Sequence, residues 1–117
     1  MAGGDTAMNI STHILDIARG LPATGVAVSL ECLEGTAWTS IRVTQTDSNG
    51  RAVLLTDDTE EPALFRLRFE TAVYFHVQEQ TSLYPYVEIV FTTERNSKHY
   101  HVPLLLAANG YTTYRGS

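Results

Sequence analysis

The segment at residues 64–70 reads LFRLRFE, with Phe and Leu at alternate positions and Arg or Glu between them. Side chains of a β-strand point to its two faces in turn, so this alternation predicts a strand with one dry and one polar face. The next ten residues, 71–80, read TAVYFHVQEQ and break the alternation. Thr71 suits an N-cap, which predicts two or three helical turns. Pro85 prevents that helix from continuing into the next strand.

The same alternation and the turn residues between segments predict further strands along the chain. The Asn-Gly pairs at residues 49–50 and 109–110 are hairpin signals because both residues accept positive φ. The other strands are predicted at residues 10–17, 26–33, 38–45, 52–56, 86–93, 99–106 and 111–115. Many short strands with one helix predict a mainly all-β fold, a β-sandwich. Residues 10–117 are expected to form one domain, preceded by a flexible tail at residues 1–9.

Length and composition exclude several classes of protein. The chain has 117 residues, of which 44% are hydrophobic and 18% charged, as in a globular domain that buries its own core. A net charge of −5 argues against a nucleic-acid partner, because phosphate binding needs a basic patch. No apolar run approaches the length of a membrane span, and residues 1–9 contain no apolar stretch of signal-peptide length, so a cytoplasmic location is expected and no membrane partner. Cys32 lies in an alternating apolar run and is interpreted as a buried apolar residue.

Four histidines are the first candidates for chemistry: His13, His76, His99 and His101. His99 and His101 are two residues apart on a predicted strand and therefore share a face. With His13 they offer the ligands of a three-histidine zinc site, although a pair of histidines on an exposed strand is more often solvated. Arg51 reads as a surface arginine after a hairpin turn, and the polar C-terminus reads as a frayed end. Composition and spacing leave these alternatives open.

Taken together, four segments resemble the signatures of a known family. They are STHILD at residues 11–16, DSNGR at 47–51, HYHVPLLL at 99–106 and YRGS at 114–117. In this order they look like the motifs of the 5-hydroxyisourate hydrolases, the transthyretin-related family of purine catabolism. Four motifs in register over almost the whole chain make the resemblance specific.

The resemblance implies a fold, an assembly and a reaction. The fold is the transthyretin-like (prealbumin-like) β-sandwich of two four-stranded sheets with one short helix after the fifth strand. The assembly is a homotetramer, a dimer of dimers, with residues 99–106 and 111–115 in subunit contacts. The reaction opens a cyclic amide of the small-molecule substrate 5-hydroxyisourate, giving 2-oxo-4-hydroxy-4-carboxy-5-ureidoimidazoline on the route from urate to allantoin. No cofactor and no metal are implied.

The family's functional positions carry over onto residues of this chain. The implied catalytic residues are His13, Arg51, His101 and Ser117, and the implied substrate-binding residues are His13, Arg51 and Tyr114. Imidazole exchanges protons near neutral pH, and a guanidinium presents a planar fork of donors to an oxygen-rich ring. The Ser117 hydroxyl is suited to positioning water, and the Tyr114 ring to holding the substrate edge.

The C-terminal tetrapeptide is expected to belong to the site. Gly116 is expected to permit a tight turn that brings Ser117 toward His13, with Arg115 anchoring the turn through a carboxylate or a carbonyl. Two alternatives belong to other classes of protein. A transthyretin-like small-molecule carrier shares the fold without the chemistry, and a metallohydrolase would use the three histidines as zinc ligands.

Overall fold

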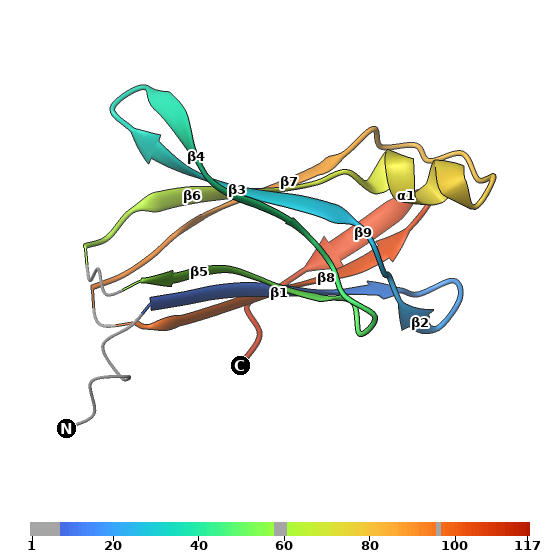
Figure 1. The fold of residues 1–117 in the computed structure, drawn as a ribbon, viewed down its shortest axis with the longest axis horizontal. Coiled ribbons are helices and arrows are strands. Elements are labelled where there is room, and N and C mark those ends of the chain that lie inside the picture. The colour runs from blue at the N-terminus through green and yellow to red at the C-terminus, as the bar shows by residue number, and fades with distance from the viewer. Residues whose placement is uncertain (1–7, 58–60, 96) are drawn as a thin grey trace.

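The computed structural model describes residues 8–57, 61–95 and 97–117, which form two facing β-sheets and one helix (Figure 1). The helix α1 spans Thr71–Val77. The strands are β1 (Met8–Asp16), β2 (Leu21–Pro22), β3 (Ala27–Glu34), β4 (Ala37–Gln45), β5 (Arg51–Asp57), β6 (Leu64–Phe69), β7 (Val87–Thr92), β8 (His99–Ala107) and β9 (Gly110–Thr113). Among the described residues, no helix is long and apolar enough to cross a membrane.

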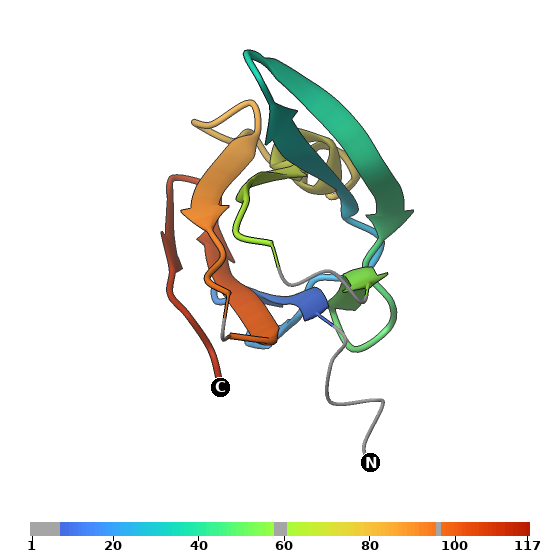
Figure 2. The same ribbon diagram turned by 90° about the vertical axis from the view of Figure 1, so that its left-hand side faces the viewer.

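The first sheet has β1 at its centre. Its order is β2-β1-β8-β9, and β5 pairs with β1 on the edge that β2 also uses. The β1–β8 pair is parallel, whereas β1 pairs antiparallel with β2 and β5. The second sheet has the order β4-β3-β6-β7, and all its pairs are antiparallel. Figure 2 looks along the layers and shows the two sheets curving around the space between them.

The core fills the space between the two sheets because each central strand turns every second side chain inward. The strand β6 is buried at Phe65, Leu67 and Phe69, as the alternation at residues 64–70 predicts. The strand β1 follows the same rule, with buried residues at even positions and half-buried ones at odd positions. Its odd-numbered side chains therefore lie on the outer face of the first sheet. Cys32, expected to be buried, is only half-buried at the margin of the core, where desolvation raises the pKa of its thiol.

The helix covers one end of the sandwich (Figure 1). Its side chains Tyr74 and Phe75 are buried against the sandwich. The Tyr74 hydroxyl donates a 2.8 Å hydrogen bond to the Asp16 carboxylate on β1. The prediction of Thr71 as the N-cap is wrong, because Glu70 holds that place while its N–H donates to the Ala27 carbonyl of β3. The helix ends at Val77, three residues earlier than predicted.

The predicted strands agree with the observed ones within two residues at each end, and the transthyretin-like sandwich is confirmed. The first sheet has five strands where four were implied, since β2 adds two residues to its edge. The strand β1 begins at Met8, so Met8 and Asn9 belong to the sheet, whereas residues 1–7 of the expected tail lie outside the described residues.

Candidate active site

The register of three strands gathers polar side chains on the outer face of the first sheet. His13 on β1 lies opposite Arg51 on β5 and Pro103 on β8. Two residues earlier on β1, Ser11 lies opposite His101. Paired residues of neighbouring strands turn their side chains to the same face. His13, Arg51 and His101, which are far apart in the sequence, therefore lie close together on one face of the sheet.

The turn before β5 fixes the start of that strand and therefore the place of Arg51. The Asp47 carboxylate oxygen Oδ1 accepts hydrogen bonds from the N–H groups of Asn49 (2.9 Å) and Arg51 (3.0 Å). These bonds, more than the nearby positive charges, lower the pKa of Asp47. Gly50 adopts φ 75°, and a Cβ there would lie 2.5 Å from the Ile14 carbonyl oxygen. Only glycine lets the turn approach β1 this closely.

His101 is half-buried and keeps one ring nitrogen in a fixed contact. Its Nδ1 lies 2.9 Å from the Ser11 hydroxyl oxygen. Burial lowers the pKa of His101, and the positive charges of Arg51 and His13 lower it further. The imidazole is therefore uncharged near pH 7. Since Nδ1 contacts Ser11, the other ring nitrogen, Nε2, is the one that can interact with a substrate.

The C-terminal segment, residues 114–117, lies against His101. The N–H of Gly116 donates to the His101 carbonyl at 2.7 Å, which forms an isolated antiparallel bridge. A Cβ on Gly116 would lie 2.7 Å from the ring atom Cδ2 of His101. The expected tight turn at Gly116 is wrong, because the residue continues the register of β9 in an extended bridge. The glycine is needed for the room it leaves to the imidazole.

Arg115 anchors this segment. Its Nη2 donates to the His99 carbonyl (3.1 Å) and to the Ser97 hydroxyl (3.3 Å), and the guanidinium carbon lies 4.5 Å from the centroid of the Tyr100 ring. The anchor is thus a carbonyl, one of the two groups expected. Figure 1 shows the chain ending beside the first sheet, on the side away from the second sheet.

Pro103 explains why the regular part of β9 stops at Thr113. The register that pairs Leu104 with Thr113 and His101 with Gly116 places Pro103 opposite Tyr114. A proline has no N–H to donate to a neighbouring strand, so the ladder is interrupted at this rung. The Tyr114 side chain is 54% exposed and lines a hollow above Pro103.

Two hollows adjoin His101 and Ser117, which line both of them. The first has a volume of about 340 Å³ and also includes His13 and Tyr114. The second has a volume of about 480 Å³ and includes Arg51. The five residues expected at the site therefore surround one continuous region of the outer face.

The histidines outside this group have other surroundings. His99 is exposed, and its Nδ1 lies 3.1 Å from the side-chain amide nitrogen of Asn9. His76 is exposed on α1. Within residues 8–57, 61–95 and 97–117, no three His, Cys, Asp or Glu side chains are grouped to hold a metal ion, so His13, His99 and His101 do not form the zinc triad considered from the sequence.

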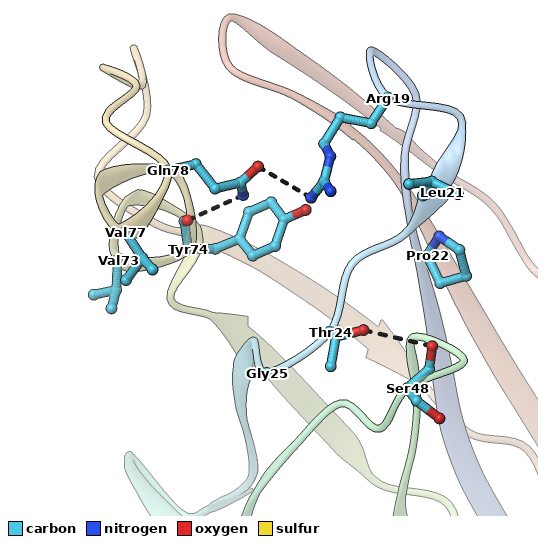
Figure 3. Close-up of a pocket in the computed structure, with 10 residues that line it drawn as sticks. All are labelled: Arg19, Leu21, Pro22, Thr24, Gly25, Ser48, Val73, Tyr74, Val77 and Gln78. Carbon is cyan, nitrogen blue, oxygen red and sulfur yellow. Dashed lines mark hydrogen bonds between the residues drawn. The ribbon is translucent and has the colours of Figure 1, made fainter.

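A larger hollow, of about 610 Å³, lies at the helix end of the sandwich (Figure 3). Arg19 donates to the Gln78 amide oxygen on one side of it, and Thr24 reaches toward the Ser48 carbonyl on the other. Its lining contains no His, Asp, Glu or Cys, so it has no group suited to proton transfer near neutral pH. The smaller hollows around His101 therefore hold the candidate active site.

Ser11 and Asp47 were not assigned a role from the sequence. Ser11 stands two residues before His13, and the period of two was the available signal that both share a face. Asp47 opens the turn of the DSNGR segment, where a carboxylate commonly accepts the N–H two residues later. Strand pairing sets the partner of Ser11, which the local sequence does not specify, whereas Asp47 finds its partners within its own turn.

Comparison with known proteins identifies the family of the chain. The model of the HIUase/Transthyretin family matches residues 10–116. The chain belongs to this family. The 5-hydroxyisourate hydrolase of Mus musculus is 44% identical over 111 residues, covering 92% of this chain and 94% of the mouse protein. The probable 5-hydroxyisourate hydrolase of Schizosaccharomyces pombe is 44% identical over 113 residues, covering 92% and 90%.

Solved structures of the HIUase/Transthyretin family have the same fold. The 5-hydroxyisourate hydrolase of Klebsiella pneumoniae is 35% identical with a TM-score of 0.83, covering 94% of this chain and 99% of that one. Transthyretin from Sparus aurata is 30% identical with a TM-score of 0.85, covering 92% and 95%. The resemblance given by the four motifs is confirmed, and the fold alone does not separate hydrolase from transthyretin.

Proposed function

We propose that this chain is a 5-hydroxyisourate hydrolase, which opens a cyclic amide of its substrate to give 2-oxo-4-hydroxy-4-carboxy-5-ureidoimidazoline. The observation that carries the proposal is the cluster of His13, Arg51 and His101 on one face of the first sheet. Relatives named 5-hydroxyisourate hydrolase, 44% identical over most of their length, support it.

Ring opening requires a nucleophilic water, a place for negative charge on the carbonyl oxygen and a proton for the leaving nitrogen. His13 and His101 supply imidazoles for proton exchange and hydrogen bonding. Arg51 supplies a permanent positive charge for the developing oxyanion. Ser117 positions water and Tyr114 holds the substrate edge, each beside the His101 ring that adjoins both hollows.

The rival candidate is a small-molecule carrier, since transthyretin of Sparus aurata shares the fold at 30% identity. A carrier has no chemical need for an imidazole of lowered pKa beside a guanidinium. The decay of freshly generated 5-hydroxyisourate, followed with and without catalytic amounts of the protein, separates the two. A hydrolase accelerates the decay over many turnovers. Unchanged decay together with stoichiometric ligand binding would establish the carrier.

The reaction is expected to need no metal, because imidazole and guanidinium supply the activation. Protein treated with a chelator and then freed of it should keep its full rate. Loss of activity that added zinc restores would replace the proposal with a metallohydrolase.

The proposed assembly is a homotetramer, a dimer of dimers. The strand β9 supports it, because it ends the first sheet with a free edge, and Tyr111 on this strand is 40% exposed. A cytoplasmic location is proposed as well, to be tested by cell fractionation.

A further inference from the structure

The Ser11 hydroxyl faces one nitrogen of His101 across the parallel β1–β8 pair. The two residues are register partners, and both side chains lie on the outer face of the first sheet. The Oγ–Nδ1 distance of 2.9 Å is that of a good hydrogen bond. Strand pairing fixes the backbones that carry the two side chains, so the contact does not depend on a flexible loop.

The direction of this hydrogen bond determines where His101 carries its proton. A neutral imidazole has one donor and one acceptor nitrogen, and its tautomer follows from the bond that one nitrogen makes. Within the described residues, Nδ1 of His101 is the only hydrogen-bond partner found for the Ser11 hydroxyl. If Nδ1 carried the proton, the hydroxyl proton would have no acceptor in the protein. A donating hydroxyl satisfies both groups and leaves the ring proton on Nε2.

We propose that Ser11 is a positioning residue that holds neutral His101 as the tautomer protonated on Nε2. The proposal rests on the proposed function and gives His101 and His13 different roles in the hydrolysis. His101 donates a hydrogen bond from Nε2 to the carbonyl oxygen of the amide and keeps its proton. His13 is then the group that moves protons.

The step balances with these roles. His13 takes a proton from water while the water oxygen bonds to the amide carbon, and the carbonyl electron pair moves onto oxygen. The resulting negative charge faces the Nε2–H of His101 and the guanidinium of Arg51. When the carbonyl forms again, the carbon–nitrogen bond breaks and its electron pair goes to nitrogen. The nitrogen takes the proton that His13 had removed.

Nitrogen NMR of the full chain tests the tautomer directly. Long-range ¹H–¹⁵N spectra at neutral pH show which ring nitrogen is protonated, and His101→Asn assigns the signals by their loss. The wild-type and the Ser11→Thr protein should both show protonated Nε2, since threonine keeps the hydroxyl. Ser11→Ala should show a mixture of tautomers. A wild-type ring protonated on Nδ1 would overturn the proposal.

Kinetics with a matched control tests the consequence. Ser11→Ala should lower kcat about 3- to 10-fold, the effect of one lost hydrogen bond, with KM little changed and Ser11→Thr close to wild type. Asn9→Ala removes the similar contact two pairs earlier, to His99 at 3.1 Å, and should leave both kcat and the His101 spectrum unchanged. Equal losses in Ser11→Ala and Asn9→Ala, or an unchanged tautomer in Ser11→Ala, would contradict the positioning role.

The two proposals fail in different ways. Wild-type protein that does not accelerate 5-hydroxyisourate decay refutes the function, while the tautomer is still read from the spectra. If Ser11→Ala did not fold, as a melting curve would show, the wild-type tautomer and the Ser11→Thr protein would still decide the question.

Discussion

His99 and His101 are two residues apart on β8, yet they meet different neighbours. His99 is exposed and lies beside Asn9, whereas His101 is half-buried beneath the C-terminal segment and beside Ser11. Both side chains lie on the same face of the sheet, as the spacing predicts. They differ in burial and in hydrogen-bond partner because different residues of the neighbouring strands lie beside them. The burial and partners of a residue on one strand are set by residues about 90 positions away.

Replacement of the individual histidines tests their assignment. His13→Asn and His101→Asn should each lower kcat by about 10²–10⁴-fold, the usual effect of losing a group in proton transfer or oxyanion binding. Arg51→Lys should also fail, since an ammonium keeps the charge without the planar fork. His99→Asn is the control and should stay near wild type. An essential His99 with a dispensable His101 would refute the assignment.

The pKa of His101 gives a prediction about pH. Burial and the positive charges of Arg51 and His13 favour the neutral ring, so its NMR titration in the folded protein should have a midpoint below the ordinary value of about 6.5. Between the two values the unfolded chain binds more protons than the folded one, so stability rises with pH. This contribution is complete above the unfolded value and lost as pH falls through the folded one. Arg51→Gln should raise the midpoint, and an unchanged midpoint would show that the charge has no effect.

At the scale of elements, the turn at residues 47–50 acts through the backbone of Arg51. Asp47→Ala removes the acceptor of two N–H groups and should lower kcat/KM about 10-fold or more, because misplaced reactive groups lose rate steeply. Asp47→Asn keeps an oxygen acceptor and should retain most of the activity. Ser48→Ala, at the exposed next residue, is the control. Equal losses for Ala and Asn would show that the charge of Asp47 matters and the turn does not.

The C-terminal segment is the second element with a function to test. Deletion of residues 115–117 removes exposed side chains, one backbone bridge and the two exposed hydrogen bonds of Arg115, but little apolar area, so the melting temperature should change little while turnover collapses. Gly116→Ala should displace the His101 ring and lower kcat by about 10²-fold. Gly110→Ala is the matched control, because a Cβ there meets nothing within 4 Å. A truncated protein with full activity would reduce the segment to a passive tail.

Local patterns predict elements well and their neighbours poorly. Alternation at residues 64–70 predicts the bounds of β6 to within one residue, because the burial of every second side chain leaves a pattern in the sequence of the strand. The two-residue strand β2 has no such pattern and depends on pairing with β1. The role of Gly116 was misjudged for the same reason, since the room it leaves is needed by a ring on another strand. The four motifs gave the expected site residues, and the structure added the contacts of Ser11 and Asp47.

At the scale of the whole molecule, each sheet ends in a strand with a free edge. On one side of the sandwich these end strands are β7 and β9 (Figure 2), while β4 ends the second sheet on the other side. An unpaired strand edge invites further strands, and a symmetric dimer covers it with a second copy of itself. Sedimentation at micromolar concentration should therefore give four times the 12.9 kDa of one chain.

A charge on the free edge tests whether β9 lies in the subunit contact. Tyr111→Lys places an ammonium on this strand outside the residues proposed for catalysis, and like charges facing each other across a two-fold axis oppose pairing. The variant should sediment as a smaller species while its circular dichroism stays that of the folded sandwich. Val77→Lys, which places a charge on the exposed end of α1 outside the proposed contacts, is the control and should remain a tetramer. A wild-type monomer would exclude the tetramer, and an undiminished Tyr111→Lys tetramer would move the contact away from β9.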